Sequence, residues 1–352
     1  YTGGSGYCDF DNISVRLAEP NGTITDNTAT WNITPTNYYT YRGPLIEEAR
    51  TNLHTQSNSV LTSANIVITT DAATAPDGTT TAAKVASTSV AGLHATGSIF
   101  SGTKVANAAY TYSRFFKAGE VGFVIPFISS GLTGTNLSAL INITTGEVVS
   151  ASSGLTVTTE QYPDGWWRVI LTATGDATTI GFYVSFNTTD AAGNASHTGD
   201  DVSGIYAWGA QLEQASAASS YIPTTTAAVT RNADVLSYDT ANWFADGQAG
   251  TIQVDADLVY TADGHSAQLF QVYGSTSKRV QVARGSSNSI SIYMADVVAQ
   301  ANFSLSGQLF KIGAPFRYIL GLEENNLASG YNGNSLGADL SCTLPSTLDN
   351  LY

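Results

Sequence analysis

Residues 45–53 read Leu-Ile-Glu-Glu-Ala-Arg-Thr-Asn-Leu, and two segments far along the chain belong with them. Residues 220–225 read Ser-Tyr-Ile-Pro-Thr-Thr, and residues 229–234 read Val-Thr-Arg-Asn-Ala-Asp. The sequence between them contains short runs of alternating apolar and polar residues, separated by Gly, Asp, Pro or Asn, as is typical of antiparallel strands. We interpret the three segments as the opening and the close of one module, residues 45–235.

These segments resemble the opening and closing signatures of a carbohydrate-binding-like jelly roll found in bacteriophage tail fibres and other virion appendage proteins. Residues 164–169, Asp-Gly-Trp-Trp-Arg-Val, and residues 204–213, Gly-Ile-Tyr-Ala-Trp-Gly-Ala-Gln-Leu-Glu, are also similar to recurring strands of that family. The resemblance covers residues 45–235, roughly half of the chain. It implies a jelly roll on a virion appendage.

Strand periodicity continues beyond this module. Residues 316–322 and 326–333 resemble the paired strands of laminin-G or concanavalin-A-like sandwiches, in which an aromatic-Asn-Gly turn separates the hairpin. Together with the near absence of helical periodicity, this predicts an all-β fold of tandem antiparallel β-sandwich (jelly-roll) domains. Within residues 45–235 we expect strands at 109–117, 137–143, 147–151, 155–161, 166–174, 180–186 and 205–213, and in the later module at 251–260, 267–273, 279–283, 289–294 and 316–322.

The domain organisation follows from these patterns. Residues 1–19 resemble the terminal strand of a preceding jelly-roll module, residues 20–44 form an aromatic-rich linker, and residues 236–352 form the laminin-G/concanavalin-A-like sandwich, which we expect to be truncated. We expect the chain to be an internal piece of a longer polypeptide. The linker carries four aromatic residues that are costly to leave in water: Trp31, Tyr38, Tyr39 and Tyr41. This cluster predicts a homo-oligomer, and the resemblance to fibres implies a trimer.

Composition excludes several classes of function. The 352-residue chain carries only 14 Lys and Arg against 28 Asp and Glu, a net charge of −14, so no basic surface is expected to bind nucleic acid. Only 12% of residues are charged, which favours a β-rich extracellular or virion protein over a cytosolic enzyme. The sequence contains no run of 18 consecutive apolar residues, so we do not expect it to insert into a membrane.

Catalytic patterns are missing from the sequence. Adjacent carboxylates such as Glu47-Glu48 point in different directions along a chain, and the four histidines lack zinc-ligand spacing. We therefore expect no enzymatic activity and no cofactor. One oxygen-rich loop, with Asp190, Asp200 and Asp201, could hold a structural Ca²⁺ ion, although such acidic loops are more often only solvated.

A sugar site needs exposed aromatic rings on which the apolar faces of sugars can stack. Trp166 and Trp167 are consecutive in a predicted strand, so their side chains must lie on opposite faces of the sheet. The outward ring could bind a glycan, or it could pack under a loop or a neighbouring subunit. Tyr162 and Tyr183 carry the same two alternatives, and all four residues are candidate ligand-binding residues.

From these observations we expect a non-enzymatic segment of a virion appendage, a tail or capsid fibre, that attaches to bacterial surface glycans. Its partners would be further copies of itself, other virion proteins and a cell-surface glycan, and its location would be the virion, outside the cell. Repeated copies would add avidity to weak individual sites. Two alternatives stay open: a purely structural or decoration protein of the virion, and an accessory binding region of a secreted bacterial glycan-degrading enzyme.

Overall fold

The computed structural model describes residues 23–25, 30–32, 45, 47–97, 102–178, 180–234, 238–239, 249–256, 267–275, 278–284, 289–296, 298–305, 315–339, 344 and 350–351. The chain divides into two units, Tyr1–Leu45 and Ile46–Tyr352. In the first unit, β1 (Thr23–Thr25) and β2 (Thr30–Asn32) pair antiparallel, with Ile24 opposite Trp31. Residues 1–19 and the linker tyrosines Tyr38, Tyr39 and Tyr41 lie outside the described residues.

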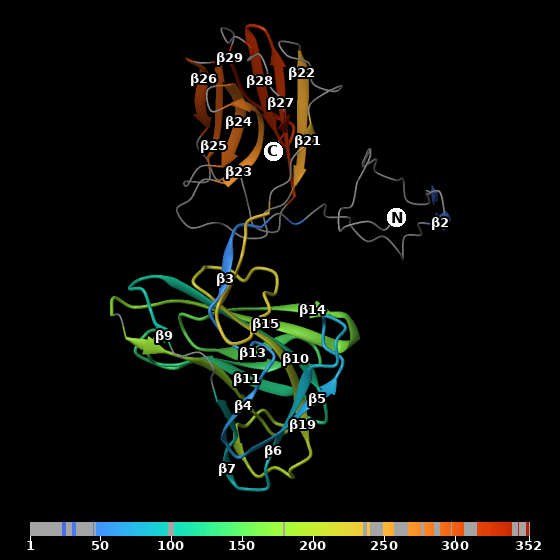
Figure 1. Cartoon of the computed structure of the whole chain (residues 1–352), viewed down its shortest axis with the longest axis vertical. Coiled ribbons are helices and arrows are strands. Elements are labelled where there is room, and N and C mark those ends of the chain that lie inside the picture. The colour runs from blue at the N-terminus through green and yellow to red at the C-terminus, as the bar shows by residue number, and fades with distance from the viewer. Residues whose placement is uncertain are drawn as a thin grey trace. The chain divides into compact units, whose positions relative to one another are not determined.

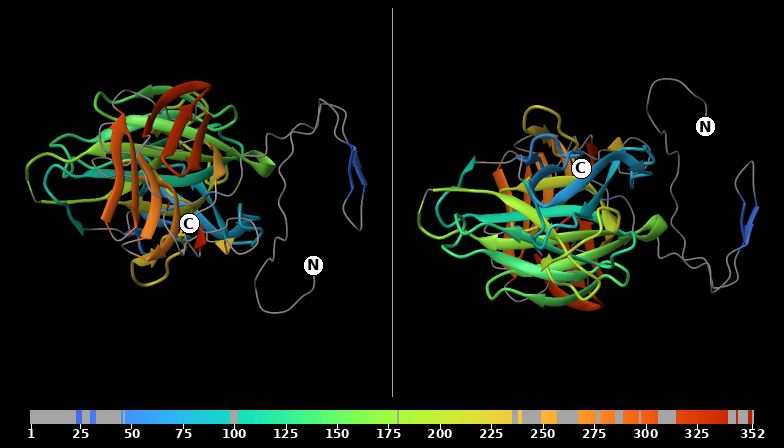
Figure 2. Two further views of the ribbon diagram at one scale, coloured as in Figure 1. Left: turned by 90° about the horizontal axis from the view of Figure 1, so that it is seen from above. Right: turned by 90° about the horizontal axis from the view of Figure 1, so that it is seen from below.

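Two six-stranded antiparallel sheets form a sandwich between residues 61 and 213 (Figures 1 and 2). The first, which we call the β10 sheet, has the order β14 (Thr156–Tyr162), β15 (Trp166–Thr174), β10 (Ala109–Ala118), β19 (Gly204–Glu213), β6 (Ala82–Ser87) and β5 (Ile66–Ala73). The second, the β11 sheet, has the order β13 (Glu147–Ala151), β12 (Leu137–Asn142), β11 (Phe123–Ile128), β17 (Val184–Thr188), β8 (Ala95–Gly97) and β4 (Leu61–Ala64).

Three short strand pairs complete this part of the chain: β16 (Gly181–Phe182) with β9 (Gly102–Thr103), β18 (Ser196–His197) with β7 (Gly92–Leu93), and β20 (Val229–Arg231) with β3 (Arg50–Asn52). The described residues contain a single 3₁₀ turn, at Pro163–Gly165, and no α-helix. The predicted all-β fold of antiparallel sheets is therefore confirmed.

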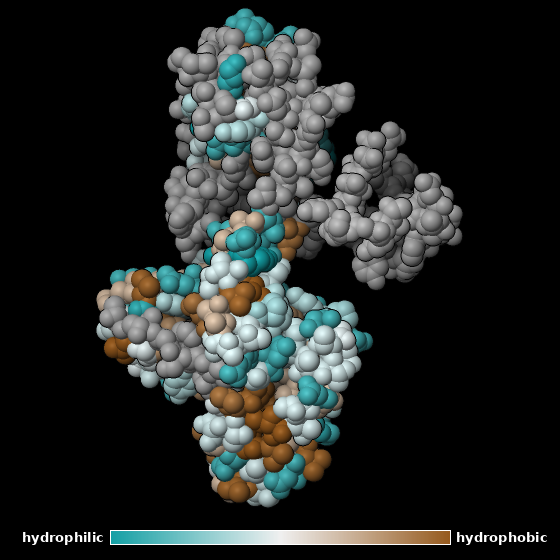
Figure 3. All heavy atoms as spheres, viewed as in Figure 1, coloured by the Kyte–Doolittle hydropathy of each residue, from teal (hydrophilic) through white to brown (hydrophobic). Residues whose placement is uncertain are grey.

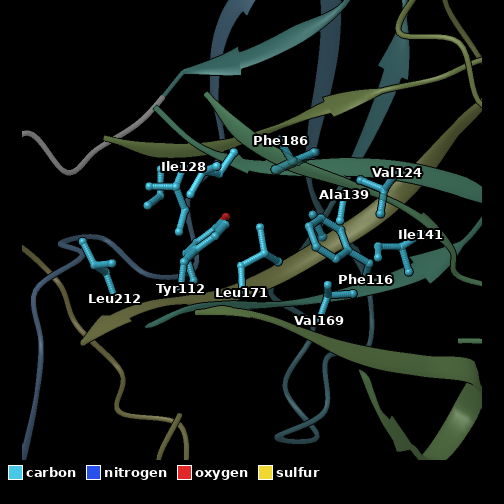
Figure 4. Close-up of a cluster of buried hydrophobic side chains, with 14 of the residues drawn as sticks. Tyr112, Phe116, Val124, Ile128, Ala139, Ile141, Val169, Leu171, Phe186 and Leu212 are labelled. Atoms are coloured by element: carbon cyan, nitrogen blue, oxygen red, sulfur yellow. The ribbon is translucent and has the colours of Figure 1, made fainter. Parts of the chain in front are cut away.

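The two sheets pack face to face around one hydrophobic core, which Figure 4 shows. Strand alternation explains its composition, because every second residue of a strand points to the same side. In β10 the even-numbered Tyr112 and Phe116 point into this core, and in β11 Val124 and Ile128 meet them from the facing sheet. All four side chains are at most 1% exposed.

The outer face of the β10 sheet carries a second, aromatic cluster. In strand β10, the odd-numbered Phe115 packs against Trp208, with the ring centroids 5.4 Å apart. Trp208 in turn packs against Tyr221, with centroids 4.5 Å apart. A bulge between Ser113 and Phe115 accommodates this packing. The bulge is matched on β19 by Gly209, whose φ of +64° favours glycine and where a Cβ atom would lie 2.9 Å from the Phe115 ring.

One predicted strand is divided. Residues 180–186, expected as a single strand, form β16 and β17 with Tyr183 between them. The division arises because β16 pairs with β9, whereas β17 pairs with β11. The other expected strands of residues 109–213 are present, with their ends shifted by at most one residue.

The opening and closing segments of the module lie together. Strand β3 pairs with β20, placing Arg50 opposite Arg231. The buried Asn52 satisfies its whole side-chain amide here: Nδ2 donates to the carbonyls of Ala210 (3.1 Å) and Ile222 (2.8 Å), and Oδ1 accepts from the N–H groups of His54 and Leu212 (3.0 Å each). These contacts join the first residues of the module to its last long strand.

Residues 238–351 form two further sheets with their own core. One sheet has the order β21 (Tyr238–Asp239), β30 (Asn350–Leu351), β23 (Ala267–Ser275), β24 (Lys278–Arg284), β25 (Ile290–Asp296) and β26 (Val298–Leu305). The other has the order β22 (Gly250–Ala256), β27 (Phe316–Glu323), β28 (Asn326–Tyr331) and β29 (Asn334–Asp339). The described strands of residues 50–231 pair only among themselves, and those of residues 238–351 do likewise.

Alternation in β27 shows how this core forms. Phe316, Tyr318, Leu320 and Leu322 are buried and belong to the core, while the residues between them point outward. The expected pairing of residues 316–322 with the strand in residues 326–333 is observed, because β27 pairs with β28. The turn at Asn332 and Gly333 then leads into β29, and Tyr331 faces Asn334 across it.

Candidate functional site

The outer face of the β11 sheet is hollowed into a groove of about 560 Å³. Because Val124 and Ile128 of β11 point into the core, the residues between them, Ile125 and Phe127, point away from it. The ladder between β11 and β12 is interrupted here, since the register pairs residues 123 and 124 and then resumes at 127. Pro126, which has no N–H to donate, lies at this gap.

The groove crosses five neighbouring strands: β12, β11, β17, β8 and β4. Its apolar lining comes from Leu93, Ala95, Gly97, Ile125 and Phe127. Its polar lining comes from Ser63, Thr96, Asn136, Ser138, Tyr183 and Asn187. The described lining therefore combines an aromatic and aliphatic surface with amides and hydroxyls.

Tyr183 is the most exposed aromatic side chain of the groove, at 45%. The break between β16 and β17 positions it, and its backbone is fixed on both sides: its N–H donates to Ser129 Oγ (2.8 Å), and its carbonyl accepts from the Ser129 N–H (2.9 Å). The ring meets Phe127 edge to face, with centroids 6.0 Å apart. Tyr183 thus offers an aromatic face on a backbone that is already held in place.

Several polar groups of the groove have no hydrogen-bond partner among the described residues. The side-chain amide of Asn187 and the hydroxyls of Ser63, Ser138 and Tyr183 are in this state. Asn136 uses only its Oδ1, which accepts from the Ser130 N–H at 2.7 Å, so its Nδ2 remains available. Thr96 differs, because its buried hydroxyl already bonds Ser185 and the Phe186 carbonyl.

The two candidate tryptophans lie on opposite faces of the sheet, as strand alternation predicts, and they differ in burial. Trp166 is 1% exposed within the outer aromatic cluster, and its Nε1 donates to the Thr74 carbonyl at 3.2 Å. Trp167 is half-buried against Gly146, where a Cβ atom would lie 2.2 Å from the ring. The alternative in which the outward indole packs under a loop is therefore the one observed for Trp166.

Of the candidate tyrosines, Tyr162 packs edge to face on Phe115 at 4.9 Å and belongs to the aromatic cluster, whereas Tyr183 lines the groove. The structure does not bring Tyr162 or the tryptophans to the groove lining. Sequence reasoning missed Phe127, Asn136 and Asn187. The alternation of residues 123–128 was the signal for Phe127, while the amides lie on segments that become neighbours only in the folded sheet.

The three candidate calcium ligands are engaged in separate hydrogen bonds, those of Asp190 and Asp200 within local turns and that of Asp201 with a distant segment. Asp190 accepts hydrogen bonds from Asn194, which lower the pKa of its carboxyl group. Asp200 accepts from the hydroxyl and N–H of Ser203, which lower its pKa to about 2, and Asp201 accepts from the Ser89 N–H. Within the described residues, no three His, Cys, Asp or Glu side chains gather as a metal site.

A second, smaller hollow of about 320 Å³ lies on β27 and β28, where Ile319 and small residues such as Gly321 and Gly330 form its surface. Its Arg317 already makes a two-pronged ion pair with Asp255, at 2.7 and 2.9 Å.

On the face of the molecule seen in Figure 3, hydrophobic residues also gather over the region of β4 and β6. The described part of the chain contains no helix with the length and hydropathy needed to cross a lipid bilayer.

The fold and the groove define an all-β protein with antiparallel sandwich architecture and a hollowed sheet face. No protein-family model matches the chain, and no curated protein sequence is similar to it.

Proposed function

We propose that this chain is a non-enzymatic segment of a virion appendage, a tail or capsid fibre, and that the groove on its β11 sheet binds glycans of the bacterial surface. The observation that carries the proposal is the exposed Tyr183 ring, which lies in a groove with an unpartnered amide, that of Asn187. Aromatic rings stack on the apolar faces of sugars, and amides both donate to and accept from sugar hydroxyls.

The assignment to a virion rests on the resemblance of residues 45–53, 220–225 and 229–234 to appendage jelly rolls. The same resemblance supports a homo-oligomeric assembly with other virion proteins outside the cell. Repeated copies would present many grooves to one polysaccharide, which raises the apparent affinity without new contacts. Each individual groove can therefore bind its glycan with low affinity.

The test is a binding measurement on the full chain against purified surface polysaccharides of bacteria, by glycan array and then by titration calorimetry. We expect Tyr183→Ala to weaken binding by about 1–3 kcal/mol, roughly 5- to 150-fold, as truncation of an interface hot spot does. The matched control is Val149→Ala, because Val149 is 48% exposed on β13 of the same sheet but does not line the groove.

Retained binding in Val149→Ala together with loss in Tyr183→Ala supports the proposal. Failure of the folded chain to bind any polysaccharide contradicts it, and so does equal binding by the wild type and Tyr183→Ala.

A further inference from the structure

The described lining of the groove contains no ionisable acid or base other than the Tyr183 phenol. The chain has 14 Lys and Arg and 28 Asp and Glu, and none of those that the structure describes lines the groove. A charged ligand group loses water on entering such a groove and regains no opposite charge, so its burial is unfavourable. The net charge of −14 adds a long-range repulsion against anionic ligands.

The polar groups of the groove that lack a hydrogen-bond partner indicate which kind of ligand the groove can bind. The amide of Asn187, the Nδ2 of Asn136 and the hydroxyl of Ser138 are neutral, and together they offer donors and acceptors. A sugar hydroxyl also donates and accepts, so it can satisfy both kinds of group at once. Carboxylates and phosphates only accept, and they are best satisfied by cations.

The dimensions of the groove indicate how much of a glycan it holds. Its lining residues lie on five consecutive strands, from Ser138 on β12 to Ser63 on β4. Neighbouring strands are about 4.8 Å apart, so the four intervals span roughly 19 Å across the sheet. This span suits several consecutive sugar rings rather than a single one.

We infer that the groove selects an uncharged oligosaccharide segment, laid across β12, β11, β17, β8 and β4, and discriminates against glycans that carry uronate, sialate or phosphate groups. This inference rests on the proposed function and names the class of glycan that the same site takes. The absence of charge in the lining sets the selectivity, and the Tyr183 and Phe127 rings supply the stacking surface.

The experiment measures the binding of acidic surface polysaccharides to the full chain in two forms, native and carboxyl-reduced. In the reduced form each uronate carboxylate has become a neutral hydroxymethyl group on the same polysaccharide backbone. Neutral polysaccharides are titrated beside them at about 50 and 500 mM NaCl, because salt screens charge interactions. We expect binding to neutral or carboxyl-reduced forms, dependence on Tyr183, and an affinity that changes less than about twofold with salt. Oligosaccharides of increasing length should bind more tightly until the groove is filled.

A charge variant tests the cause of the selectivity. Ser138→Lys places a cation in the groove at a hydroxyl without a partner, and Ser150→Lys adds the same charge on the neighbouring strand β13, outside the groove. We expect Ser138→Lys to bind the native acidic form at least about tenfold more tightly than Ser150→Lys does.

Equal gains in the two variants would overturn the inference, because only the net charge would then matter. Tyr183-dependent, salt-sensitive binding of a native acidic polysaccharide by the wild type would also overturn it, while leaving the proposed glycan-binding function intact. Absence of binding to every polysaccharide would remove the proposed function itself.

Discussion

Glu47 and Arg231 form an ion pair although 184 residues separate them in the sequence. Glu47 is 5% exposed, and its carboxylate also accepts a hydrogen bond from the Ser220 N–H at 2.8 Å. Its backbone N–H donates to the carboxylate of Asp234 (2.9 Å), and its carbonyl accepts from the Asp234 N–H (2.8 Å). Glu47, at the opening of the module, therefore bonds to three residues at its close: Ser220, Arg231 and Asp234.

The first prediction concerns acid stability. Burial opposes ionisation of Glu47, but hydrogen bonds from Arg231 and Ser220 outweigh it and hold the pKa of its carboxyl group below the usual value. The unfolded chain therefore takes up this proton first, and the free energy of unfolding falls as the pH drops below the model-peptide value of about 4.3. Glu47→Gln should lower the free energy of unfolding at pH 7 by about 1–3 kcal/mol and reduce this acid dependence.

Urea unfolding of the full chain between pH 3 and 7, followed by fluorescence, checks this prediction. The matched control is Glu48→Gln, which changes the adjacent, exposed carboxylate. Equal effects of the two variants would show that the contacts of the Glu47 carboxylate with Arg231 and Ser220 make no specific contribution to stability.

A second pH dependence should come from His54. Burial, and then the positive charge of Arg114, lower the pKa of this histidine to about 4. Because an unfolded histidine has a pKa of about 6.5, the unfolded chain binds more protons between pH 6.5 and 4, and stability falls as the pH drops through this range. Between pH 7 and 5.5 we expect a loss of about 1 kcal/mol in the free energy of unfolding, which His54→Phe should abolish. A slope that persists in His54→Phe would assign it to another group.

The third prediction concerns Asn52, three of whose four hydrogen bonds join β3 to β19 and to the segment after it. Asn52→Ala leaves the carbonyls of Ala210 and Ile222 without this donor, and unsatisfied buried groups cost about 1–3 kcal/mol each. Thermal unfolding should show a large decrease in stability. Thr51→Ala, which removes only an exposed hydroxyl contact with Thr230, should change stability little.

A fourth prediction separates the tryptophans from the groove. Trp166→Ala should cost about 3–5 kcal/mol of stability, because it leaves a cavity among buried aromatic rings. Trp167→Ala should cost less, since its ring is half-buried. Neither change should alter glycan affinity in the fraction that remains folded, as measured by calorimetry. Loss of binding in folded Trp167→Ala would place the site elsewhere than the groove.

Much of the architecture follows from the sequence alone. Period-two alternation in segments such as residues 109–117 and 316–322 determines which side chains can face a core, because a strand points successive residues to opposite sides. The interpretation of residues 45–53, 220–225 and 229–234 as the two ends of one module also came from the sequence, through their resemblance to a family of jelly rolls. The all-β class follows from the same local patterns.

The candidate site depended on tertiary structure. Sequence placed Trp166 and Trp167 on opposite faces, but only packing shows that Thr74 and the aromatic cluster cover the first. The groove brings Ser63 to the same surface as Asn187, because β4, β8 and β17 become neighbours in one sheet through long-range pairing. Local periodicity fixes the face of each residue, whereas strand order, which is set by the global packing of both sheets, decides which faces become adjacent and which remain open to a ligand.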